Sequence, residues 1–427
     1  MTVALTVSLV LCASGFQGPE PPKRVSLADA IRIAQLNNPA LGAAQSDAQG
    51  ARETAKAARA MMLPQISANG FATSGNNSSI MASSPSAMPP VWMLVPTGNF
   101  LDGNLAFMLP ILAPRLRALA GSATWQAQAA AGELVEASAD LTLQVTDAYD
   151  RVLLSRQMIL AEEAKVTAGQ ELVRTTKALF DSGKGIDASV QRSIAELSEG
   201  TRALANARND EAKAILDLEA AMGADMSTPI DPSDTLLVPP NSLSLADYIA
   251  KAKESRGVLM AARARRQASA QDIKAAQGQR LPQVYGSLMS DAANHSDIGG
   301  VSAGLTVSFP LFDGGRISAE VAQARSMRTK ADAAVKQAEI LVEKEVRQRW
   351  LDVQTAHVNA LSAEAAVSAA KAAYDVTALR VSAGKSLLVE QLDALEALVR
   401  AKADLAQSTF DQALAVARLN RAAGGQQ

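Results

Sequence analysis

The chain has 427 residues, enough for two or three ordinary domains. Its formal net charge is −2, so no overall positive charge points to a nucleic-acid partner. Aromatic residues make up only 4% of the chain, which is low for a large globular core. Alanine is abundant, and Ala-rich helices that approach one another closely are typical of helical walls. No apolar run reaches about 18 residues, so we expect no membrane-spanning helix.

The N-terminal residues predict export. An apolar run from Val3 to Cys12 is followed by small residues, which is typical of a secretory signal peptide over residues 1–15. Lipidation of Cys12 is an alternative, although Leu11 is larger than the residue that usually precedes a lipidated cysteine. Because Cys12 is the only cysteine, the mature chain would have neither a disulfide nor a thiol nucleophile.

The rest of the chain is a tandem duplication. Leu27 and Leu245 lie in the same Ser-Leu-Ala-Asp motif, and Pro64 and Pro282 lie in the same Leu-Pro-Gln motif. Both pairs are separated by the same number of positions, which indicates a repeated unit. We therefore predict a first repeat over 16–223, a linker over 224–242, a second repeat over 243–424 and a tail over 425–427.

Each repeat begins with helical patterns, interrupted in the first repeat by Pro39, and continues into a pair of strands. The strand pairs are predicted within 65–111 and 283–312. The first pair is about 18 residues longer, and the additional residues form a Ser/Pro/Met-rich segment over 76–97 that predicts a long loop.

The last predicted strand has one apolar and one polar face. From Val301 to Leu311, apolar side chains alternate with small or polar ones. About ten such residues cross a bilayer as a tilted strand of a closed barrel. The turn that follows, Asp313-Gly314-Gly315, leads directly into a helical pattern.

Two very long helices follow the strand pairs. Residues 114–181 and 316–382 contain no proline after their first position, and they show apolar spacing at three- and four-residue steps. Each would be about 100 Å long, longer than a membrane is thick. Glycine turns near 183 and 384 end them, and return helices follow over 187–222 and 387–423. Such sustained periodicity predicts antiparallel helical hairpins with coiled-coil packing.

Four strands per chain cannot close a barrel, and an open edge in lipid would leave costly unpaired backbone amides. Several chains must therefore share one barrel. A shared barrel that continues into a tube of long helices is a conduit.

The motif Phe-Pro-Leu-Phe-Asp-Gly-Gly-Arg over 309–316, the duplication and the glycine tips resemble the TolC-like outer-membrane efflux protein family. The resemblance implies that Pro310, Asp313, Gly314 and Gly315 form the junction between strand and helix. The corresponding segment of the first repeat, 109–115, lacks the Asp-Gly-Gly turn, so its turn geometry is expected to differ.

This resemblance implies a mainly helical fold with membrane strands. Three chains would share a twelve-stranded outer-membrane β-barrel, and their helical hairpins would form an α-barrel in the periplasm. The implied function is the exit duct of a tripartite efflux system. The partners would be two further copies, a periplasmic adaptor, an inner-membrane pump of RND or ABC type and outer-membrane lipid. A type I protein-secretion outlet remains an alternative, and a periplasmic coiled-coil scaffold or adaptor is an alternative of another class.

Two acidic residues are candidates for a periplasmic gate or selectivity ring. Glu390 and Asp393 lie three positions apart and share a helix face. The resemblance places them at two acidic rings around the pore, where three copies would gather six carboxylates and attract cations. The simpler alternative is that acidic side chains favour the first turn of a helix.

The glycine turns are candidates for the adaptor-docking surface. They comprise Gly183, Lys184 and Gly185 at the first tip and Gly384, Lys385 and Ser386 at the second. Glycine also supplies the positive φ that a tight turn between helices requires, so a purely structural role is the alternative.

An enzyme, a metal site or a cofactor is not expected. The two histidines, His295 and His357, are far apart in sequence, and no His/Cys/carboxylate group has the spacing of metal ligands.

Overall fold

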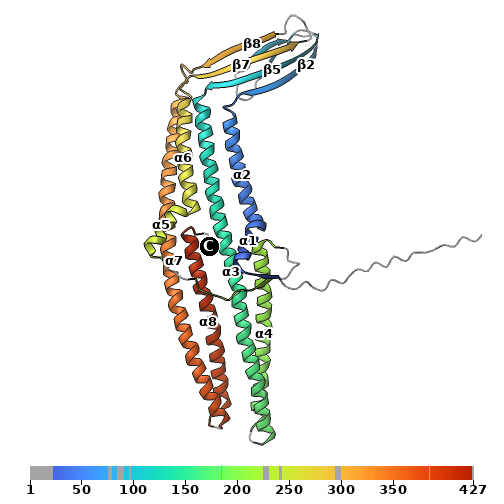
Figure 1. The fold of residues 1–427 in the computed structure, drawn as a ribbon, viewed down its shortest axis with the longest axis vertical. Coiled ribbons are helices and arrows are strands. Elements are labelled where there is room, and N and C mark those ends of the chain that lie inside the picture. The colour runs from blue at the N-terminus through green and yellow to red at the C-terminus, as the bar shows by residue number, and fades with distance from the viewer. Residues whose placement is uncertain are drawn as a thin grey trace, which may run out of the picture.

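The computed structural model describes residues 23–75, 79–83, 91–95, 98–183, 185–224, 230–239, 243–293, 300–383 and 385–425. Long helices form a rod, and a sheet caps one of its ends (Figure 1). The predicted signal peptide with Cys12 lies outside the described residues, as do Lys184, His295 and Gly384. Among the described helices, none combines the length and apolar character needed to cross a membrane.

Both repeats have the same order of main elements: two helices, two paired strands, a long helix and a return helix. The helices are α1 (Leu27–Asn37), α2 (Pro39–Ala60), α3 (Pro114–Asp181), α4 (Asp187–Met222), α5 (Leu245–Ser255), α6 (Gly257–Gly278), α7 (Arg316–Ser382) and α8 (Leu388–Ala422). The strands are β1 (Lys23–Val25), β2 (Gln65–Gly75), β3 (Ser79–Ser83), β4 (Val91–Val95), β5 (Gly98–Leu112), β6 (Ile230–Pro232), β7 (Gln283–Ala293) and β8 (Gly300–Ser308).

The residues at the N-termini of α2 and α5 are ones that favour the start of a helix. Pro39 does not simply interrupt a helix, because it occupies the first turn of α2, where its missing N–H is harmless. The Asn38 side chain caps that turn by accepting hydrogen bonds from the backbone N–H groups of Ala40 and Leu41. In the second repeat, Ser244 and Asp247 form a capping box at the start of α5.

The main sheet joins the two repeats. Its four antiparallel strands have the order β2-β5-β7-β8, so β5 of the first repeat pairs directly with β7 of the second. The register shifts between Pro110 and Leu112, where proline lacks the N–H that a regular ladder requires. Strands β2 and β8 are the two edges of this sheet.

The strand register gathers apolar side chains of all four strands of this sheet on one face. Val307 lies opposite Val284, and Ala303 lies opposite Leu288. Leu288 in turn lies opposite Phe107, which faces Ile66 on β2. Because directly opposed residues point to the same side of a sheet, these residues form one continuous apolar face.

The other face carries polar groups, since side chains alternate along each strand. There the Asn69 amide donates a hydrogen bond of 2.8 Å to the Asn104 side-chain oxygen. Along β8 the same face bears Ser302, Gly304 and Thr306. This second face is the more polar of the two, and it also carries Met108 and Met289.

Strand β8 is shorter than the pattern over 283–312 predicts, because it ends at Ser308. Pro310 cannot donate to a ladder, and the residue before a proline is conformationally restricted. Leu311 and Phe312 continue the apolar pattern in sequence, but they lie in the turn and are 90% and 92% exposed.

Two segments expected to be irregular contain additional strands. Within the predicted loop over 76–97, β3 and β4 form an antiparallel pair, in register from Ser79 opposite Val95. The predicted linker over 224–242 contains β6, which pairs in parallel with β1 in the N-terminal lead-in. These strands were missed because they are short and their pairing partners could not be read from local periodicity.

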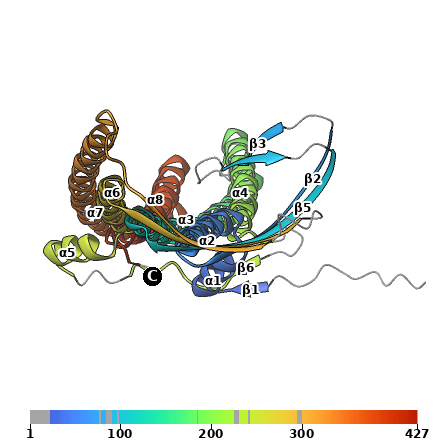
Figure 2. The same cartoon turned by 90° about the horizontal axis from the view of Figure 1, so that it is seen from above.

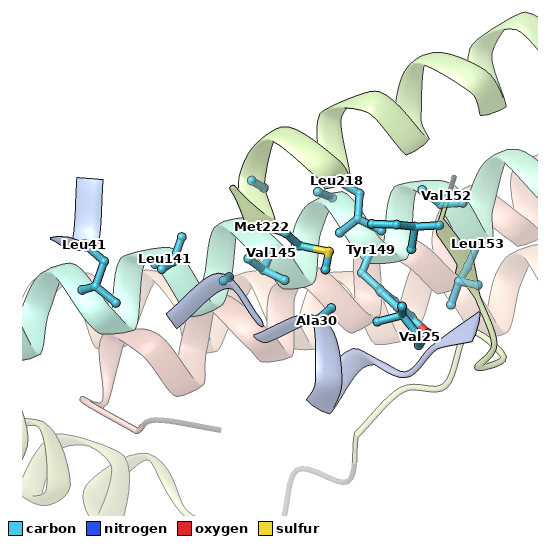
Figure 3. Packing of buried hydrophobic residues seen from close by; sticks show 14 residues of the cluster. Val25, Ala30, Leu41, Leu141, Val145, Tyr149, Val152, Leu153, Leu218 and Met222 are labelled. Atoms are coloured by element: carbon cyan, nitrogen blue, oxygen red, sulfur yellow. The ribbon is translucent and has the colours of Figure 1, made fainter. Parts of the chain in front are cut away.

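The core of the first repeat surrounds Tyr149 near the middle of α3 (Figure 3). Tyr149 is buried with Val145 and Val152 on α3 and with Leu218 and Met222 on α4. Its hydroxyl lies 3.0 Å from the Val25 carbonyl oxygen and 2.9 Å from an Asp234 carboxylate oxygen. Burial raises the pKa of Tyr149 to about 12, so the hydroxyl stays protonated and ties β1 and the linker to α3.

The two repeats meet where α3 crosses α6. A Cβ built on Gly257 would lie 2.2 Å from the Gly132 carbonyl oxygen and 2.7 Å from the Glu136 backbone nitrogen. A Cβ on Gly132 would lie 2.8 Å from the Gly257 carbonyl oxygen. The helix backbones are therefore in direct contact, which requires glycine at both positions.

A cluster of charged side chains lies beside this crossing. Arg256 is buried and donates hydrogen bonds of 2.9 Å to both Glu136 on α3 and Glu345 on α7. Arg421, near the end of α8, pairs with the same two glutamates and with Asp140. Two guanidinium groups and three carboxylates thus join α3, α7 and α8 to the junction between α5 and α6.

Candidate functional site

The first helical tip is a tight turn with two structurally required glycines. Gly183 has φ of 72°, which is favourable only without a side chain, and a Cβ on it would meet nothing within 4 Å. A Cβ on Gly185 would lie 3.0 Å from the Phe180 backbone nitrogen, and the Gly185 N–H donates to the Leu179 carbonyl oxygen at 3.0 Å. These contacts support the structural role for both glycines and leave the docking role untested.

The second tip is built similarly. The Lys385 N–H donates to the Arg380 carbonyl oxygen at 2.8 Å, which closes the end of α7, and the Lys385 side chain is exposed. The Ser386 hydroxyl donates a hydrogen bond to the Glu390 carboxylate in the first turn of α8.

Both tips expose a large apolar side chain that was not predicted from the sequence. Ile186 and Leu387 are the N-cap residues of α4 and α8, and they are 67% and 69% exposed. An N-cap normally carries Ser, Thr, Asp or Asn, whose side chain binds a free backbone N–H. The presence of large apolar residues at these equivalent caps was the signal in the sequence, since such residues stabilise neither the helix nor a solvated surface.

Glu390 and Asp393 lie near the start of α8, and both are exposed. Leu392 between them is buried, so the two acidic residues share the side of α8 that faces away from its packed surface. The hydrogen bond from Ser386 favours a local stabilising role for Glu390, whereas the exposure of both carboxylates agrees with a ring around a pore.

The strand-to-helix junction of the second repeat is fixed by Asp313. Its carboxylate accepts hydrogen bonds from the backbone N–H groups of Ile317 at 2.8 Å and Gly315 at 3.0 Å. These N–H donors hold the pKa of Asp313 below its usual range. Gly314 and Gly315 have φ of 63° and 89°, and they turn the chain after Pro310 into α7.

The corresponding junction of the first repeat has a different geometry. Only Ala113, with φ of −136°, separates β5 from α3, and Pro114 opens the helix without any side-chain cap. A Cβ on Gly278 at the end of α6 would lie 2.9 Å from the Arg115 backbone nitrogen, so α6 packs directly on this start.

The described residues contain no group of three or more His, Cys, Asp or Glu side chains that could hold a metal ion. His357 lies on α7, where its Nδ1 is 3.1 Å from the Gln412 amide on α8.

Comparison with known proteins agrees with this architecture. The family model described as Outer membrane efflux protein matches residues 30–224 and 248–425, which is one match in each repeat. The chain belongs to the outer membrane efflux protein family. This membership confirms the predicted family, its outer-membrane location and its role in efflux. The family is one of transport proteins rather than enzymes.

Individual relatives are distant. The outer membrane efflux protein BepC of Brucella suis is 27% identical over 291 residues, which cover 66% of this chain and 62% of BepC. The outer membrane protein TolC of Vibrio cholerae is 24% identical over 414 residues, which cover 93% of this chain and 90% of TolC. The crystal structure of the outer membrane protein VceC from Vibrio cholerae has a TM-score of 0.76 at 21% identity, covering 93% of this chain and 96% of VceC. The shared fold confirms the predicted fold class.

Proposed function

We propose that three copies of this chain form the exit duct of a tripartite efflux system. The observation that carries this proposal is the four-stranded sheet with two open edges, whose strands continue directly into helices of 68 and 67 residues. The sheet is long enough to cross a bilayer, and the helices, about 100 Å long, extend well beyond one.

Closure of the barrel requires neighbouring copies. Within the described part of the chain, β2 and β8 each pair on one side only in the main sheet. In hydrocarbon, each unsatisfied backbone group costs several kcal/mol. Pairing β8 of one copy with β2 of the next satisfies both edges. It also places the apolar face toward lipid, and three copies give the twelve strands that the family resemblance implies.

The helices form the periplasmic tunnel in this proposal. Viewed from above, they follow a curved row beneath the bent sheet, as one sector of a tube would (Figure 2). At the far end, the exposed Ile186 and Leu387 and the turns around Gly183 and Lys385 receive the periplasmic adaptor. Glu390 and Asp393 line the nearby constriction as an acidic ring. The duct itself performs no chemistry, and the inner-membrane pump supplies the energy.

The first test is the assembly and conductance of the purified full chain. We expect a trimer in detergent by light scattering, and cation-selective channels in planar bilayers. A monomer that washes off outer membranes with salt would contradict the proposal and favour a periplasmic scaffold.

A deletion strain tests the cargo. Increased sensitivity to toxic small molecules supports efflux, whereas loss of a secreted protein with unchanged sensitivity supports the type I secretion alternative. Complementation with the intact gene is the control for both outcomes.

A further inference from the structure

The duplication specifies how adjacent copies meet, and this inference rests on the assembly proposed above. Within one chain, α3 follows β5 and α6 precedes β7, so the pairing of β5 with β7 brings α3 beside α6. We call this contact the repeat seam. At the two edges of the sheet, α7 follows β8 and α2 precedes β2 within each chain. Pairing of β8 with the next copy's β2 therefore brings α7 beside the next copy's α2, a contact that we call the copy seam.

Buried residues fix which positions of the two repeats are equivalent. Val145 corresponds to Val346 and Leu218 to Leu419, and all four are fully buried. Leu41 corresponds to Leu259 by the spacing of the N-terminal motifs, and both are buried. Each residue of the repeat seam therefore has a counterpart in the copy seam.

The copy-seam surfaces are exposed in the single chain. On α6, Ala261 and Ala268 are buried against α3, whereas their α2 counterparts Ala43 and Gly50 are exposed. On α3, Gly132 is buried, whereas its α7 counterpart Ala333 is exposed. Small residues thus continue on both unpartnered helix faces. Because Ala333 has a methyl group where Gly132 has none, the copy seam must be wider than the repeat seam.

The charged cluster of the repeat seam has no counterpart in the copy seam. All five charged positions are replaced by neutral residues. Glu136 corresponds to Gln337, Asp140 to Leu341, Glu345 to Gln144, Arg256 to Asn38 and Arg421 to Ala220.

Near the position equivalent to one ion pair of the repeat seam, the copy seam also carries two charged residues. Arg265 on α6 pairs with Glu133 on α3, and Ala129, one turn before Glu133, lines the same groove. The counterpart of Arg265 is Asp47, and the counterpart of Ala129 is Lys330. Both are exposed, and neither forms an ion pair within the described part of its own chain. The geometry points to an ion pair between Lys330 of one copy and Asp47 of the next, with the opposite polarity to the pair in the repeat seam.

Disulfide formation between copies tests this contact, because the chain has only Cys12. The full-length double variant Asp47→Cys with Lys330→Cys should form an intermolecular ladder up to a cross-linked trimer on a non-reducing gel. The matched control combines Asp47→Cys with Lys344→Cys. Lys344 is also exposed, but it lies about 21 Å further along α7, beyond the reach of a disulfide. Single-cysteine variants show any reaction of Cys12.

Charge reversal tests the electrostatic part. Asp47→Lys and Lys330→Asp should each lower the temperature at which the trimer dissociates, and the double reversal should recover most of the loss. A wild-type protein that is not a trimer would overturn the assembly itself. A trimer without the Asp47–Lys330 cross-link, or one in which the double reversal gives no recovery, would overturn the pair and leave the assembly intact.

Discussion

Substitution of Gly257 by alanine is the most direct perturbation of the contact that holds the two repeats together. Gly257 opens α6 beside the Gly132 carbonyl oxygen, and an added methyl would lie 2.2 Å from that oxygen and 2.7 Å from the Glu136 nitrogen. Both neighbours are backbone atoms of α3, which cannot rotate away as a flexible side chain would. The two helices must therefore separate by roughly 1 Å to restore van der Waals distance.

The expected change in the free energy of unfolding has three contributions. Overpacking of a tight contact costs about 1–3 kcal/mol. Separation also lengthens the part-buried hydrogen bond from Arg256 to Glu136 and the exposed one from the Val258 N–H to Glu136, and loosening these charge-assisted contacts adds about 1–2 kcal/mol. The gain in helix propensity from glycine to alanine is at most about 1 kcal/mol. We therefore expect Gly257→Ala to destabilise the chain by about 1–4 kcal/mol.

The assay is thermal unfolding of the detergent-solubilised protein, followed by circular dichroism. Gly257→Ala should lower the midpoint by roughly 1–5 °C, because the unfolding entropy of a chain of this size is about 0.9 kcal/mol per degree. Gly200→Ala on α4 is the matched control, because a Cβ there would lie no closer than 3.6 Å to its nearest neighbour and the equivalent residue of the second repeat is already alanine, Ala401. It should leave the midpoint unchanged or raise it slightly. An unchanged midpoint for Gly257→Ala would refute the idea that backbone contact fixes the repeat seam.

Three further predictions concern the tips, the acidic pair and a buried carboxyl group. The double variant Ile186→Ser with Leu387→Ser should no longer co-purify with the adaptor, because it lacks the exposed apolar contact. The trimer should persist, because serine is a better N-cap than isoleucine or leucine. Retained co-purification would exclude these side chains from docking. Glu390→Gln with Asp393→Asn should lower the cation-to-anion permeability ratio in planar bilayers several-fold, and an unchanged ratio would support the local helix-capping role. Burial raises the pKa of Asp150 to about 7, with a smaller contribution from Asp147. A carboxyl group with a raised pKa in the folded state reduces stability as the pH rises from about 4 to 7. In thermal unfolding, Asp150→Asn should therefore be more stable than wild type by about 1–3 kcal/mol at pH 8 and nearly equal to it at pH 4. An equal gain at both pH values would contradict the raised pKa of Asp150.

The sequence alone determined the features that depend on local periodicity and on turn residues. The long helices α3 and α7, the glycine turn at Gly183 and the alternation in β8 all follow from spacing that each segment carries within itself. The duplication was equally visible, because matching motifs recur at a constant separation. The end of β8 was predicted too late, since its apolar alternation continues past Pro310, which stops the ladder.

Only the tertiary structure decided which distant segments meet. The pairing of β1 with β6, the contact of Gly132 with Gly257 and the binding of Arg421 to Asp140 join residues from separate parts of the chain. A local pattern does not specify these contacts, because they depend on the crossing of helices and on the strand order that places one repeat beside the other. The exposed Ile186 and Leu387 needed the structure for the same reason, since an apolar residue in sequence becomes a candidate docking site only when nothing in its own chain covers it.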